Sequence, residues 1–98
     1  MKIVYKLFKP ELIQEGDTFW TSVGGFSVQP FKIEEVNSHY FRYRNDRFAM
    51  KFDFGENVFP SGFVERKTSE GFERYVSPEV LGIEKLLRGN DQDILVDE

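Results

Sequence analysis

The sequence predicts an α+β fold that is mainly β. We expect a strongly bent antiparallel sheet, or a small barrel, of five to six strands with a C-terminal helix. Within residues 47–54, large apolar side chains occupy every second position, which is typical of a half-buried strand. Similar short runs recur, separated by Asn, Ser, Gly and Pro. Finally, the Ser-Pro-Glu sequence at residues 77–79 is a helix-start signal.

The predicted strands follow one another in a simple order. Residues 2–8 form the first strand, and a connection over residues 10–17 ends in a Gly-Asp turn. The second strand spans 18–23, and a Gly-Gly pair and Pro30 interrupt the extended structure before the third strand at 31–36. Tight turns at 37–39 and 45–46 join this strand to 40–44 and 47–54 as a meander. Residues 63–67 and 72–76 form a hairpin.

The C-terminal part is predicted to be helical over residues 78–88. Ser77 caps the first turn, Pro78 occupies the first helical position, and Gly89 ends the helix. Four large apolar side chains share one helix face, and we expect this face to dock on the sheet or to plug the end of a barrel. They are Val80, Ile83, Leu86 and Leu87.

The 98 residues are enough for one domain, which we place at residues 1–89, followed by an acidic tail at 90–98. The tail holds Asp91, Asp93, Asp97 and Glu98, and the other 13 acidic residues balance the 13 basic ones. We expect the tail to be a frayed terminus. Alternatively, it adds as a strand to an exposed sheet edge, its own or a partner's, beside a basic neighbour such as residues 42–47.

Composition excludes several classes of protein. There is no cysteine, and therefore no disulfide framework, thiolate zinc site or thiol nucleophile. The first ten residues do not resemble a signal peptide, and no run approaches the roughly 20 apolar residues of a membrane span. We expect a soluble, cytoplasmic protein with no membrane partner.

Two stretches resemble the opening of SH3-like small barrels of the Tudor and KOW kind. In residues 12–20 a Gly-Asp pair leads into a strand, and in residues 31–43 an apolar-x-apolar-x-x-Val run turns at Asn into the next strand. The likeness covers residues 12–54, about half the chain. It implies a strongly bent sheet and a recognition role, and a five-stranded OB-like barrel is the competing topology.

The segment with the most functional promise is 39–47, where arginines alternate with aromatic residues. Exposed rings beside guanidinium groups suit a single-stranded nucleic acid. In the alternative interpretation, Phe41 and Tyr43 are core and the arginines pair with Glu34, Glu35 or Asp53 across strands. The candidate binding surface comprises Trp20, Tyr40, Arg42, Arg44, Arg47 and Lys51.

Trp20 has two interpretations. It is an exposed ligand platform or interface anchor, because Phe19 and Val23 fit the core pattern better. Alternatively, it packs under the C-terminal helix.

Catalytic chemistry finds little support in the sequence. The only imidazole, His39, falls in a predicted turn, where a histidine is usually solvated. Glu34 and Glu35 are adjacent, so a regular strand directs them to opposite sides. Asp91 and Asp93 lack the further oxygen ligands of a calcium loop. We therefore expect no enzyme activity, no cofactor and no metal.

The sequence favours a non-enzymatic module for protein–protein interaction, of an accessory or inhibitor type. The alternative is single-stranded nucleic-acid binding through residues 39–51. A homodimer is compatible with long aromatic strands that leave a sheet edge open.

Overall fold

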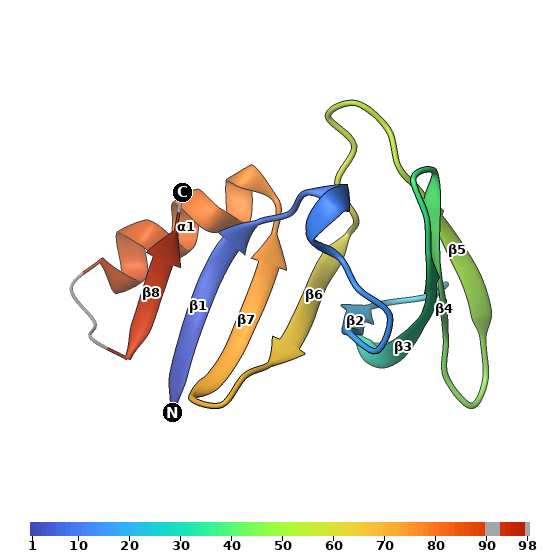
Figure 1. Ribbon diagram of the computed structural model, residues 1–98, viewed down its shortest axis with the longest axis horizontal. Helices are drawn as coiled ribbons and strands as arrows, with labels where there is room; N and C mark the ends of the chain where they lie inside the picture. Colours follow the sequence, from blue (N-terminus) through green and yellow to red (C-terminus); the bar gives the residue numbers. More distant parts are fainter. Residues whose placement is uncertain (90–92, 98) are drawn as a thin grey trace.

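In the computed structural model, which describes residues 1–89 and 93–97, the chain forms one eight-stranded mixed sheet (Figure 1). The strand order is β5-β4-β3-β2-β6-β7-β1-β8. A short 3-10 helix, η1 (Pro10–Leu12), follows the first strand, and the helix α1 (Pro78–Arg88) precedes the last. The strands are β1 (Lys2–Leu7), β2 (Thr18–Thr21), β3 (Gln29–Val36), β4 (Tyr40–Arg44), β5 (Ala49–Asp53), β6 (Gly62–Lys67), β7 (Gly71–Val76) and β8 (Ile94–Asp97).

The mainly β architecture with one C-terminal helix is confirmed. Strands β3, β4 and β5 form the predicted antiparallel meander, and β6 and β7 form the predicted hairpin. The sheet has more strands than the expected five to six, and it is not closed, because its edge strands β5 and β8 lie at opposite ends of the strand order. A small SH3-like or OB-like barrel is therefore not confirmed.

The additional strands come from parallel pairing between distant parts of the chain. Strand β1 lies between β7 and β8 and pairs with both in parallel. Residues 94–97 of the acidic tail are thus the edge strand β8 rather than a frayed terminus. Their neighbour is β1, not the basic residues 42–47. Asp91 and Glu98 of the predicted tail lie outside the described residues.

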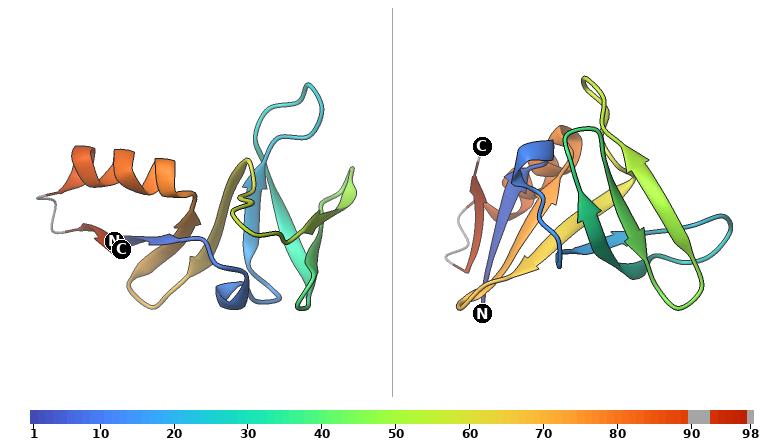
Figure 2. Two further views of the ribbon diagram at one scale, coloured as in Figure 1. Left: turned by 90° about the horizontal axis from the view of Figure 1, so that it is seen from above. Right: turned by 45° about the vertical axis from the view of Figure 1, so that its right-hand side comes forward.

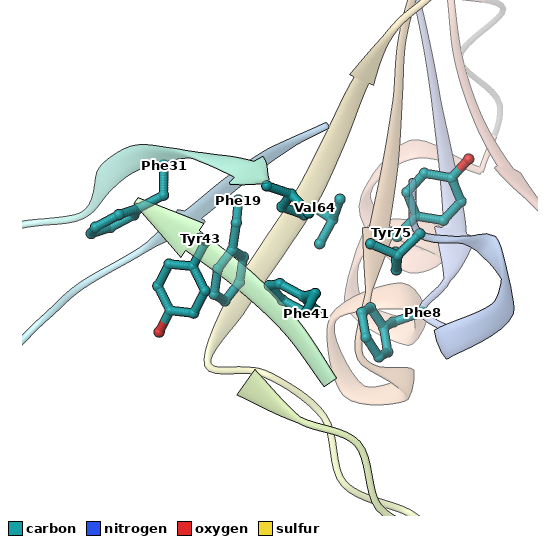
Figure 3. Close-up of a cluster of buried hydrophobic side chains, with 9 residues drawn as sticks. Phe8, Phe19, Phe31, Phe41, Tyr43, Val64 and Tyr75 are labelled. Atoms are coloured by element: carbon teal, nitrogen blue, oxygen red, sulfur yellow. The ribbon is translucent and has the colours of Figure 1, made fainter. Parts of the chain in front are cut away.

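The larger hydrophobic core fills the curled half of the sheet, as Figure 3 shows. Phe19 meets Phe41 and Tyr43 edge to face, with ring centroids 5.2 Å and 4.8 Å apart. Such aromatic pairs stabilise a core beyond the area that they bury. The buried members are Phe8, Ile13, Phe19, Phe31, Ile33, Phe41, Tyr43, Val64 and Tyr75.

The second, smaller core lies between the opposite face of the sheet and α1. Its buried members are Tyr5 of β1, Val76 of β7 and Leu81 of α1. In the view from above, α1 runs along one side of β1, β7 and β8, whereas β2–β5 turn away as the curled half (Figure 2). The two cores thus lie on opposite faces of the sheet, the larger one against the curled half and the smaller one under α1. This helix is not long enough to cross a membrane, nor is any other in the described ranges.

The expectation that Val80, Ile83, Leu86 and Leu87 dock on the sheet is wrong. Within α1 only Leu81, which lies on the other side of the helix, is buried, and all four residues of the predicted docking face are exposed. Helical periodicity determines which residues share a face. It does not determine which face turns toward the sheet, and here Leu81 packs inward against Tyr5 and Val76.

Candidate functional site

The predicted binding surface on β4 and β5 holds two ion pairs that join β4 to β3 and one pair within β5. Arg42 and Arg44 alternate with the buried Phe41 and Tyr43, as predicted, and face outward. The Nε atom of Arg42 lies 3.0 Å from Glu35, and that of Arg44 lies 3.4 Å from Glu34. On β5, the Lys51 ammonium lies 3.4 Å from Asp53. The two arginine pairs are the cross-strand pairs of the alternative interpretation, whereas Asp53 pairs with a lysine of its own strand.

Glu34 and Glu35 do not point to opposite sides of the strand, so that expectation is wrong. The pairing of β3 with β4 shifts register between Ile33 and Glu35. This irregularity is a β-bulge, and the extra residue breaks the alternation of side chains. Both carboxylates therefore lie on the outer face, where they meet arginines two residues apart on β4.

Aromatic rings also contact three cations of this surface. The Arg42 guanidinium and the Lys51 ammonium lie 5.1 Å and 5.0 Å from the centre of the Tyr40 ring. Arg47 lies apart from them, with its guanidinium 5.3 Å from the Phe26 ring centre. A hollow of about 360 Å³ with Glu34, Arg42, Arg44 and Lys51 among its lining residues opens on this face. The sequence thus predicted the composition of this surface and, in the alternative interpretation, the two glutamates that pair with its arginines.

Trp20 is neither a fully exposed platform nor a fully buried core residue. Its ring is half-buried and stacks on Phe63, with centroids 6.4 Å apart and planes at 19°. The indole N–H donates to Glu65 at 3.2 Å, and Glu65 also accepts a hydrogen bond from Arg74 at 2.9 Å. Because Arg74 donates in turn to the Tyr5 hydroxyl, Trp20 belongs to a polar network on the same face as the smaller core. It is therefore separate from the β4–β5 surface.

A buried polar network that sequence reasoning missed joins η1 to the sheet. Arg66 donates to both carboxylate oxygens of Asp17 at 2.8 Å, to the Tyr75 hydroxyl at 2.8 Å and to the Leu12 carbonyl at 2.7 Å. Hydrogen bonding to Asp17 raises the pKa of Arg66, and burial raises the pKa of Tyr75. The Gly-Asp turn was visible in the sequence, but its partner Arg66 is 49 residues away.

The network continues through β7 to β1. Tyr75 donates to Glu73 at 3.4 Å, and the Lys6 ammonium lies 2.8 Å from Glu73. The hydrogen bond from Lys6 lowers the pKa of Glu73. This chain of contacts links β1, β6 and β7. Every charge in it has a partner, which is the arrangement of a structural network rather than of a reactive site.

The outward face of α1 is the clearest unexplained feature of the surface. We define the α1 stripe as Val80, Ile83, Leu86 and Leu87, whose exposed fractions are 39%, 49%, 88% and 69%. Leu81 on the opposite side of the helix is 7% exposed. Scattered exposed apolar residues are normal, but a contiguous apolar patch marks a contact surface. Helix α1 is therefore apolar on the side that faces away from the sheet.

His39, the single histidine of the sequence, lies in a turn, as predicted. His39 is exposed in the turn after β3, where its backbone N–H donates to the Asn37 side chain at 2.8 Å. Over residues 1–89 and 93–97, no three His, Cys, Asp or Glu side chains converge as metal ligands would. Comparison with known protein families, with curated proteins and with solved structures gives no match to this chain.

Proposed function

We propose that this chain is a protein-interaction module and that the α1 stripe is its contact surface. The observation that carries the proposal is the orientation of α1, which turns four large apolar side chains to solvent and only Leu81 to the sheet. An amphipathic helix gains most of its stability by burying its apolar face. A helix that presents this face outward is suited to a partner's groove or helix.

The energetics of the stripe favour a binding role over a structural one. Burying a leucine side chain contributes about 1.5–3 kcal/mol relative to leaving it exposed. Leu86 and Leu87 contribute little of this within the chain, because both remain largely exposed. Apolar residues held in place on a helix, already ordered before contact, add affinity at a small entropic cost.

The nucleic-acid alternative has weaker support. Arg42, Arg44 and Lys51 each lie within 3.0–3.4 Å of a carboxylate. A phosphate would have to displace these carboxylates, and the two glutamates brought outward by the bulge add negative charge where the ligand would sit. The proposal assigns no catalytic step to the chain.

Site-specific photocrosslinking in native cells tests the proposal. A photoreactive residue at Leu86 should give discrete crosslinked products, because this side chain is the most exposed of the stripe. The products should disappear when Ile83→Lys and Leu87→Lys are added, because two buried charges oppose an apolar contact. The same photoreactive residue at Ser69, in the exposed turn between β6 and β7, is the matched control. Equal labelling patterns at the two positions would overturn the proposal.

A further inference from the structure

We infer that the free edge of β5 pairs with β5 of a second copy of this chain, antiparallel about a two-fold axis at Phe52. Strand β5 ends the strand order, and Figure 1 and Figure 2 show it as the outermost strand of the curled half. Within residues 1–89 and 93–97, β4 is the only strand that pairs with it. This edge is separate from the α1 stripe, so the inference does not depend on the proposed function.

The backbone of β5 offers hydrogen-bonding groups along this edge. The Phe54 N–H donates to the His39 carbonyl at 2.8 Å, and the Phe48 carbonyl accepts from the Asn45 N–H at 2.9 Å. Backbone groups alternate in direction along an antiparallel strand, so the even-numbered residues bond to β4, whereas residues 49, 51 and 53 direct their N–H and C=O groups away from it. A row of this kind is a template for another strand.

Strand β5 is regular along its whole length, unlike the edges that natural proteins protect. It pairs with β4 in continuous register over its five residues. Its sequence contains no proline, and its two charged side chains, Lys51 and Asp53, lie on the outer face and not toward the core. On the other face Met50 is 42% exposed, so a neighbouring strand would also bury apolar area.

The two charged side chains make this edge complementary to itself. Lys51 and Asp53 are two residues apart and therefore share one face of the strand. A two-fold contact centred on Phe52 places Lys51 of each copy opposite Asp53 of the other. A shift of two residues in one direction would place Lys51 opposite Lys51, and the reverse shift would place Asp53 opposite Asp53. Because like charges directly opposite are destabilising, charge selects the register centred on Phe52.

The contact gives Lys51 a better neighbour than its own sheet does. Within the chain, Lys51 stands opposite Arg42 of β4, a like charge, and its ammonium lies 3.4 Å from Asp53 of its own strand. In the paired edges, an opposite charge lies directly across from Lys51. The backbone groups of residues 51 and 53 both point outward, so the same two residues also exchange main-chain hydrogen bonds. Backbone and charge therefore specify one register.

Sedimentation velocity of the purified chain tests the pairing. Between about 1 and about 500 µM, the average mass should rise from that of a monomer toward twice that value. The Lys51→Asp and Asp53→Lys single variants should remain monomeric, because each places like charges opposite one another. The double variant with both changes exchanges the two charges and keeps the net charge of the parent. It should dimerise as the parent does.

Three results would overturn the inference: a parent that stays monomeric, a single variant that still dimerises, or a double variant that does not. A variant with Leu86→Lys and Leu87→Lys on the α1 stripe is the control for self-association through the helix, and it should dimerise as the parent does. Loss of the dimer in this variant would assign the contact to α1 and also overturn the inference. So would masses above that of a dimer, since a two-fold contact is closed.

Disulfide trapping tests the register, since the chain has no cysteine of its own. The Lys51→Cys and Asp53→Cys variants are mixed, one of them with an added tag. Residues opposite each other in a hydrogen-bonded pair have Cα atoms about 5.5 Å apart, within the range of a disulfide. Linkage between the two variants should therefore be faster than linkage within either one, whose cysteines lie on a diagonal. Faster linkage within one variant would refute the register centred on Phe52.

Discussion

Replacing Arg66 by methionine should destabilise this protein far more than the same change at a surface arginine. Arg66 makes two hydrogen bonds to Asp17, whose side chain is only 5% exposed, while 23% of the Arg66 side chain remains exposed. Hydrogen bonds to charged groups contribute about 1.5–3 kcal/mol each. Because of the residual exposure we take the lower value, and two bonds then give about 3 kcal/mol. Removing one partner of a buried ion pair costs a similar amount.

Urea unfolding followed by circular dichroism and by Trp20 fluorescence measures this loss. With a slope of about 1 kcal/mol per M urea for a domain of this size, the midpoint should fall by about 3 M. The control is Arg44→Met, which breaks the pair with Glu34 on the exposed surface of β3 and β4. Its effect should be close to the experimental error, since exposed ion pairs contribute little.

Two results would refute the reasoning about Arg66. One is an equal loss of stability in the Arg66→Met and Arg44→Met variants. The other concerns the double variant of Arg66→Met with Asp17→Asn. If the ion pair is the cause, the double variant should lose less stability than the sum of the losses in the two single variants. The reason is that the substituted asparagine carries no charge that would be buried without a partner. Strict additivity would show that the two side chains act independently.

Two further predictions concern the β1–β7 half of the sheet. Gly71→Ala should lower the unfolding free energy by about 2 kcal/mol or more, because the new Cβ would lie 1.8 Å from the Lys2 carbonyl oxygen of the neighbouring strand. Gly25→Ala, where nothing lies within 4 Å of the new Cβ, should change little, and equal effects in chemical unfolding would contradict the close packing. The hydrogen bond from Lys6 lowers the pKa of Glu73 in the folded state, so its stabilisation is present above the ordinary carboxyl pKa of 4.5 and is lost as the pH falls below that value. Urea titrations between pH 6 and pH 3 should show a smaller acid-induced loss for Glu73→Gln than for the parent; identical slopes would exclude this contribution.

The sequence by itself determined the local structure of this protein. Alternation of apolar residues and turn residues such as Asn37 defined the β3–β4–β5 meander, because neighbouring strands pair through short turns. Ser77 and Pro78 marked the start of α1 correctly. The chemistry of the β4–β5 surface was also visible, since outward arginines and inward aromatics follow from the period of two.

Only the tertiary structure decided how distant segments combine. Parallel pairing of β1 with β7 and β8 joins residues that are far apart in the chain, and no turn signal specifies it. The β-bulge that turns both Glu34 and Glu35 outward depends on register with β4. The rotation of α1, which leaves the α1 stripe exposed, depends on how Leu81 fits against Tyr5 and Val76. Periodicity is a local property of the chain, whereas the choice of partner for each face is made by packing over the whole molecule.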